Sequence, residues 1–157
     1  MDNSGYIIKS KIDFGVHKDL TIDQEEYCFD VCLDENGASL LMNSKEQMFT
    51  EKLRSLLKFG TFSRRYKDIF DMCYLIDKLD VNKLQYCLKK YIYDDEGMKE
   101  NNIDDIIKRL SLTLKNKFFQ NRVKTSRRNW LNKDVEILTN EIIDFFKMLK
   151  KEVSVNV

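Results

Sequence analysis

Apolar residues return at every third or fourth position through nearly all of the chain beyond residue 43, a spacing typical of amphipathic helices. The earliest of these segments starts at Ser44, whose spacing to Gln47 matches a helix capping box, and it stops at Gly60. Segments with the same spacing predict helices over 64–79, 81–93, 103–119 and 131–151, with an exposed loop over 94–102. The periodicity therefore predicts a helical bundle for residues 44–157.

Residues 1–43 follow a different pattern, in which apolar and polar residues alternate. Segments 5–14 and 26–33 predict two strands, and 38–42 predicts a shorter third strand after a turn at Glu35-Asn36-Gly37. The predicted fold class is α+β, with a short β-region over 1–43 followed by a helical domain over 44–157. No linker is visible between the two.

Composition excludes several classes of protein. No apolar run reaches the roughly 18–20 residues that cross a bilayer, and the N-terminus has no secretory signal pattern. The four cysteines stand singly inside apolar segments, unlike the disulfide framework of a secreted domain. We therefore expect a soluble cytoplasmic protein with no membrane partner.

The formal net charge of +1 hides a strong asymmetry. Residues 1–51 hold eleven acids and four bases, whereas 52–157 hold fifteen acids and twenty-three bases. Segment 106–133, here called the basic stretch, has nine bases and no acid, so it would attract a polyanion if its bases share one face. Its candidate RNA-binding residues are Lys115, Lys117, Arg122, Lys124, Arg127 and Arg128.

Trp130 lies beside Arg127 and Arg128 at the start of the helix predicted over 131–151. A tryptophan that opens an amphipathic helix belongs more often to the core, although an exposed indole could stack on a base. We expect the core placement.

The densest group of chemically active side chains lies around residues 64–71. On a helix, Lys67 and Asp71 would be one turn apart, with Asp68 beside them and the Arg64-Arg65 pair next to them. Carboxylates can hold Mg²⁺ or orient a hydroxyl, and cations can bind phosphates. A solvated helix start with acids favoured by the helix dipole is the plainer alternative.

Two more candidates come from earlier in the chain. Glu51 and Lys52 stand on the preceding predicted helix, and Lys52 would point into the same cleft if the two helices pack antiparallel across Gly60. Otherwise Glu51 and Lys52 form an ordinary surface pair. Asp13 lies between Ile12 and Phe14 near a predicted strand end, where a carboxylate can face a site or solvent equally well.

Three motifs together carry a family resemblance: Asn43-Ser44-Lys45-Glu46-Gln47, Glu51-Lys52-Leu53, and Arg65-Tyr66-Lys67-Asp68-Ile69-Phe70-Asp71. In residues and spacing they resemble the AbiEii/AbiGii nucleotidyltransferase toxin family. That family implies a nucleotidyltransferase core of the polymerase-β type followed by a helical C-terminal domain. Its members are toxins of bacterial abortive-infection (phage defence) and toxin–antitoxin systems, and characterised relatives transfer a nucleotide from an NTP, some of them onto tRNA ends.

The resemblance also implies roles for individual residues. It makes Asp13 a Mg²⁺ ligand and a catalytic carboxylate, and it assigns nucleotide contacts to Glu51, Lys52, Arg65 and Lys67. It adds Lys67, Asp68 and Asp71 as catalytic residues. Mg²⁺ would be the cofactor and an NTP the substrate.

The chain departs from the family pattern at one point. The first two metal carboxylates of the family come from a Gly-Ser and Asp-x-Asp hairpin, and this sequence contains neither motif. The resemblance thus implies the C-terminal half of a member, in which the β-region is a remnant of the catalytic core. Expected partners are NTP, tRNA, and either a cognate antitoxin or a separately encoded N-terminal half.

Two functions fit these observations, and whether the chain is an enzyme stays open between them. The first is a truncated nucleotidyltransferase toxin that transfers NMP from NTP to tRNA or another acceptor. The alternative is a catalytically inactive remnant that binds nucleotide or antitoxin. A helical protein that binds RNA through the basic stretch alone would leave the clustered motif unexplained.

Overall fold

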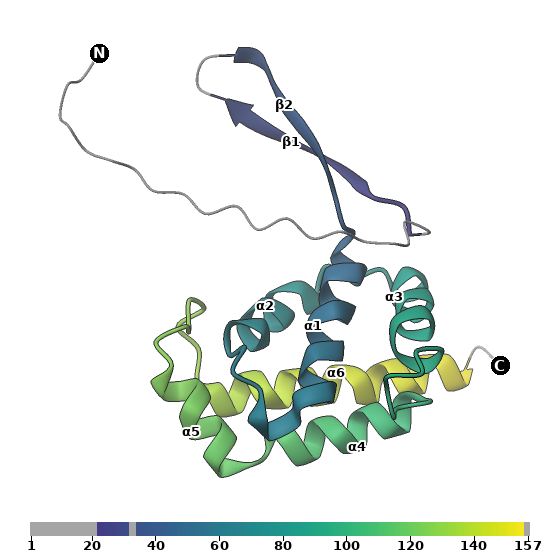
Figure 1. Cartoon of the computed structure of the whole chain (residues 1–157), viewed down its shortest axis with the longest axis vertical. Helices are drawn as coiled ribbons and strands as arrows, with labels where there is room; N and C mark the ends of the chain where they lie inside the picture. Colours follow the sequence, from purple (N-terminus) through teal and green to yellow (C-terminus); the bar gives the residue numbers. More distant parts are fainter. Residues whose placement is uncertain (1–21, 32–33, 156–157) are drawn as a thin grey trace.

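The computed structural model describes residues 22–31 and 34–155 of the 157-residue chain. A two-stranded antiparallel hairpin precedes a helical body (Figure 1). The elements in chain order are β1 (Glu25–Val31), β2 (Asp34–Met42), α1 (Lys45–Phe59), the 3₁₀-helix η1 (Gly60–Phe62), α2 (Lys67–Ile76), α3 (Val81–Leu88), the π-helix η2 (Lys89–Tyr93), α4 (Ile103–Leu114), α5 (Lys117–Thr125) and α6 (Val135–Val155). The α+β class predicted from the sequence is confirmed. The strand predicted over 5–14 lies outside the described residues.

The hairpin reverses earlier than the sequence predicted. Val31 pairs with Asp34, so Glu35-Asn36-Gly37 lies inside β2 and not in the turn. After a register shift between Val31 and Phe29, the ladder continues to a Glu25–Met42 pair, whereas a turn centred on Asn36 would place Met42 opposite residue 30 and leave the start of β1 unpaired. The longer ladder satisfies more backbone donors and acceptors, and this overrides the local turn preference.

The helical body is organised around α6. This helix packs against α2, α4 and α5, while α1 packs between α2 and α3 (Figure 1). Phe49 of α1 is fully buried, and its ring lies 5.8 Å from that of Phe145 and 6.0 Å from that of Phe146 on α6. These apolar contacts fix the position of α1, and α1 in turn positions Lys52. No helix of the described residues is long and apolar enough to cross a membrane.

Helix boundaries differ from the sequence pattern at one important place. A single helix was predicted over 103–119, but the chain turns after Leu114 and a separate helix, α5, begins at Lys117. Asn116 caps α5, because its side-chain oxygen accepts a hydrogen bond from the backbone N–H of Phe119 at 3.0 Å. The turn buries Phe119 and leaves Phe118 exposed, which a continuous helix along the α4 axis would not do.

Two further helices begin later than predicted. Helix α2 begins at Lys67 and not at residue 64, so Arg65 belongs to the segment that leads into it. Helix α6 begins at Val135 and not at residue 131, and Asp134 accepts hydrogen bonds from the backbone N–H groups of Glu136 and Ile137. Trp130 therefore lies in the connection between α5 and α6.

Candidate functional site

Five charged side chains meet where α1 packs against the start of α2. Lys52, from the middle of α1, places its Nζ 2.9 Å from Asp71 Oδ2 and 3.4 Å from Asp68 Oδ1. Because α1 and α2 pack side by side after the Gly60 turn, residues far apart in sequence become direct partners. The group is here called the ion cluster and consists of Lys52, Arg65, Lys67, Asp68 and Asp71.

The cations of the ion cluster are more exposed than its carboxylates. Arg65 donates from Nε to Asp68 Oδ2 at 2.7 Å, and Lys67 Nζ lies 3.4 Å from Asp71 Oδ2. The Arg65 and Lys67 side chains are 65% and 64% exposed, against 10% for Asp68 and 13% for Asp71. The carboxylates thus form the floor of the site, and two of its cations face solvent.

The charged groups of the ion cluster shift each other's pKa values. Burial raises the pKa of Asp71, but the hydrogen bond and charge of Lys52, the charge of Lys67 and the Trp130 N–H outweigh it, so the pKa lies below its ordinary value of 3.8. The hydrogen bond and charge of Asp68 raise the pKa of Arg65. Asp71 and Arg65 are therefore held in their charged forms at neutral pH.

Trp130 belongs to this site, and the expectation that it would lie in the core is wrong. Its indole Nε1 donates to Asp71 Oδ1 at 3.2 Å, and its ring packs edge-on against Tyr74 with the centroids 5.2 Å apart. The residue remains 48% exposed. Its only local sequence signal is the neighbouring Arg127-Arg128 pair, which gives no indication of contact with α2.

Of the other predicted site residues, Glu51 makes no bond with the ion cluster. Glu51 accepts a hydrogen bond from Gln47 Nε2 at 3.0 Å along α1, although its charge still contributes to the raised pKa of Arg65. Asp13 lies outside the described residues. Its role as a Mg²⁺ ligand and catalytic carboxylate stays a prediction.

The part of the basic stretch from Lys115 onward lies next to the ion cluster at one end of the molecule. Arg122 of α5 lies over the ring of Tyr66, the residue before Lys67, with 5.6 Å from Cζ to the ring centroid. Arg122 Cζ also lies 5.5 Å from the centroid of the Phe118 ring, so part of the guanidinium packs against aromatic side chains. Other predicted RNA-binding residues are exposed and pair with no carboxylate in the described part of the chain: Lys115, Lys117, Lys124, Arg127 and Arg128.

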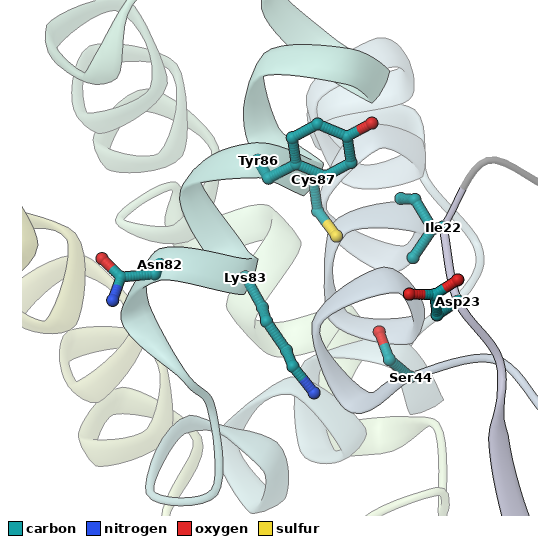
Figure 2. A pocket seen from close by; sticks show the side chains of 7 residues that line it. All are labelled: Ile22, Asp23, Ser44, Asn82, Lys83, Tyr86 and Cys87. Atoms are coloured by element: carbon teal, nitrogen blue, oxygen red, sulfur yellow. The ribbon is translucent and has the colours of Figure 1, made fainter.

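A cavity of about 470 Å³ lies on the other side of α1, beside α3. Figure 2 shows Ile22 and Asp23 on one wall, facing Lys83 and Tyr86 of α3. None of the predicted site residues is among the side chains that line it. We place the candidate site at the ion cluster and not in this cavity, because the predicted site residues converge at the cluster from separate segments of the chain.

The described residues do not fit a Mg²⁺ site. No group of three or more His, Cys, Asp or Glu side chains among them is arranged to hold a metal ion. Asp68 and Asp71 are already bonded to cationic side chains, which would repel a divalent cation. What the ion cluster can do is bind an anion with its exposed cations.

A protein-family model matches most of the chain. No curated protein and no solved structure matches the chain. A family model described as "Nucleotidyl transferase AbiEii toxin, Type IV TA system" matches residues 4–147, which is most of the sequence. The match contains every residue of the ion cluster together with Trp130 and the basic stretch. The chain therefore belongs to the AbiEii nucleotidyl transferase toxin family of type IV toxin–antitoxin systems.

Proposed function

We propose that the ion cluster binds the triphosphate of an NTP and that the protein transfers the nucleoside monophosphate to an RNA hydroxyl, with tRNA as the acceptor. One observation carries the proposal: Lys52, Arg65 and Lys67 converge on two largely buried carboxylates in a chain of a nucleotidyl transferase family. The family also implies an antitoxin as a partner of the toxin.

The exposed cations suit phosphate binding. The Lys67 ammonium has three N–H donors and uses one on Asp71, so two remain for phosphate oxygens. Arg65 uses Nε and Nη2 on Asp68 and keeps further guanidinium donors toward solvent. Three cations face two carboxylates in the ion cluster, so a positive charge is left over to favour an anion.

Asp68 and Asp71 act as positioning residues in this proposal. They hold the lysine and arginine side chains in place before a nucleotide arrives, which lowers the entropic cost of binding. In the transfer step, the acceptor hydroxyl oxygen forms a bond to the α-phosphorus of the NTP. At the same time the bond breaks between the α-phosphorus and the oxygen that bridges it to the β-phosphorus. Pyrophosphate leaves, the hydroxyl proton passes to solvent, and Lys52, Arg65 and Lys67 neutralise the negative charge that develops on the leaving group.

Mg²⁺ is part of the proposal only through residues outside the described structure. Asp13 is its proposed ligand, and the ion cluster acts on the phosphates. We expect a chelator such as EDTA to abolish transfer while phosphate binding to the ion cluster persists.

The test is incubation of the purified chain with each α-labelled NTP, Mg²⁺ and total tRNA, with label in RNA as the readout. We expect Lys67→Ala to lower transfer about tenfold or more, because removal of one preorganised charge from a phosphoryl-transfer site has an effect of at least that order. Lys67 is exposed, so the variant should fold normally.

Lys147→Ala is the matched control. Lys147 is also an exposed helical lysine with a one-turn ion pair, to Asp144 at 2.8 Å, but it lies near the far end of α6. Equal transfer by the wild type and Lys67→Ala would contradict the proposed role of the ion cluster. NTP binding without transfer, with binding lost in Lys67→Ala, would favour the alternative of a nucleotide-binding protein without catalysis.

A further inference from the structure

The connection between α5 and α6 holds Trp130 in a defined position. Arg127 and Asn132, on either side of it, adopt φ angles of 52° and 53°, a region that residues other than glycine rarely enter. Within the connection, Asn129 Nδ2 donates to the carbonyl of Lys133 at 2.7 Å, and the backbone N–H of Trp130 donates to the carbonyl of Arg128 at 3.0 Å. Strained backbone that is held by several such bonds indicates a fixed conformation.

The indole is anchored on the ion cluster by its polar edge. Trp130 Nε1 bonds to Oδ1 of Asp71, while both lysines bond to Oδ2 of the same carboxylate. The Asp71 carboxylate thus holds the Trp130 ring and the ammonium groups of Lys52 and Lys67 in fixed positions relative to each other. With about half of Trp130 exposed and Tyr74 packed edge-on against the ring, indole surface is left for another aromatic partner.

This arrangement combines the two kinds of group that a nucleotide can bind. Phosphates need cations, and a nucleobase needs a flat aromatic surface a short distance away. Every nucleobase has a π-face, so stacking on an indole is compatible with any of the four bases. The placement of Trp130 beside the phosphate-binding lysines provides both elements in one site.

We propose that Trp130 is a nucleotide-binding residue that stacks on the base of the NTP whose phosphates bind Lys52 and Lys67. The inference rests on the proposed function, since it assumes that the triphosphate occupies the ion cluster. It adds a residue from the basic stretch to the nucleotide site, and it links that site directly to the proposed RNA surface.

Trp130 is the only tryptophan of the chain, so its intrinsic fluorescence reports this site alone. The experiment titrates the wild type with ATP, CTP, GTP and UTP in turn, and in parallel with inorganic tripolyphosphate, which has the phosphates and no base. We expect NTP to quench the fluorescence strongly and tripolyphosphate to change it little. Calorimetry of the same ligands gives affinities that do not depend on fluorescence.

Variants separate stacking from a purely structural role. We expect Trp130→Ala to weaken NTP binding about tenfold, which is the usual size of a lost base–aromatic stack. Tripolyphosphate binding should stay within about twofold. Trp130→Phe keeps an aromatic face without the indole N–H and should retain most of the NTP affinity. The tripolyphosphate arm checks the ion cluster, and a far-UV circular dichroism spectrum of each variant checks separately that it is folded.

Each other result overturns the inference in a distinguishable way. Equal weakening of NTP and tripolyphosphate in Trp130→Ala would mean that the indole only positions the lysines. Unchanged NTP binding in that variant would mean that Trp130 makes no contact with the base, and the proposed function would stand. Quenching by a single-stranded RNA oligonucleotide but not by NTP would assign the stacked base to the acceptor. Absence of NTP binding in the wild type would contradict the proposed function as well.

Discussion

Asp71 is the residue on which the candidate site depends most directly. It accepts hydrogen bonds from Lys52, Lys67 and Trp130, which come from α1, from α2 itself and from the connection before α6. A carboxylate that joins three segments contributes to the geometry of all of them. Partly buried charge-assisted hydrogen bonds of this kind are stronger than the ordinary surface ion pair.

The lowered pKa of Asp71 predicts a pH dependence of stability. Because its pKa in the folded protein lies below the ordinary 3.8, the unfolded chain binds more protons than the folded one near that pH. The stabilisation is therefore complete above the ordinary pKa and is lost as the pH falls through the folded value. We expect urea unfolding between pH 7 and pH 3 to show a smaller loss of stability in Asp71→Asn than in the wild type.

Asp77→Asn is the control for this measurement. Asp77 follows α2 directly, is exposed and forms no ion pair within the described residues, so the change removes the same formal charge without breaking the ion cluster. If both variants follow the wild-type pH curve, Asp71 contributes nothing to acid stability.

At the scale of elements, the join between α1 and α2 sets the site. Gly60 ends α1 with φ +53° and ψ −133°, and its N–H donates to the carbonyl of Leu56. Arg109 of α4 donates from Nε to the carbonyl of Leu57 at 3.2 Å and so satisfies another group of the last turn of α1. The chain can then turn sharply, and the start of α2 comes back beside Lys52.

Gly60→Ala is predicted to destabilise the fold. A Cβ at this position would be strained by the positive φ and would lie 2.8 Å from Nη2 of Arg109. We expect a loss of roughly 1–3 kcal/mol in the free energy of unfolding, measured by urea denaturation. We also expect weaker tripolyphosphate binding, because α2 would shift relative to Lys52.

Gly97→Ala provides the comparison within the same chain. Gly97 has no positive φ, and a Cβ there would meet only the Asp95 side chain at 3.0 Å. Its cost should be smaller, with no effect on phosphate binding. Equal losses in the two variants would mean that the turn geometry at Gly60 has no special importance.

At the scale of the whole molecule, the helical body brings the ion cluster and the part of the basic stretch from Lys115 onward to the same end. Figure 1 shows α5 and the connection after it beside α2, with the C-terminal end of α6 at the opposite end. An RNA bound along α5 would therefore lie beside the ion cluster, where we propose that the nucleotide binds. The exposed bases of α5 and of the connection after it thus lie where we propose that the acceptor RNA binds.

The combined change of Lys124, Arg127 and Arg128 to alanine tests the RNA surface. Because these side chains are exposed and form no ion pair with described carboxylates, their removal should weaken tRNA binding without unfolding the protein. The slope of log affinity against log salt should fall by about 0.7–0.9 for each RNA phosphate that is no longer neutralised, measured by filter binding at several salt concentrations. Arg122 is left intact because it also packs on Tyr66.

The control removes the same number of positive charges from the opposite end of the molecule. Lys147, Lys150 and Lys151 lie near the C-terminal end of α6 and are exposed. If their combined change to alanine lowers tRNA affinity and salt dependence as much as the first variant does, binding follows net charge and not the basic stretch.

The sequence by itself determined the features that depend on near neighbours. Helical periodicity predicted most of the helices and the α+β class, and the Lys67–Asp71 pair could be predicted because residues four apart on a helix always lie close together. The register of the hairpin and the break between α4 and α5 were predicted wrongly. The register depends on how many backbone pairs the whole ladder can form, and the break depends on which side chains become buried against other helices.

The tertiary structure decided which distant residues share a site. Lys52 is 19 residues from Asp71, and Trp130 is 59 residues from it. Periodicity indicates which face of a helix is buried, but it does not fix the angle and offset at which two helices pack, and these decide which polar side chains meet. The packing of α1 against α2 brought Lys52 to Asp71, and the packing of α2 against α6 brought the connection that carries Trp130 to the same carboxylate.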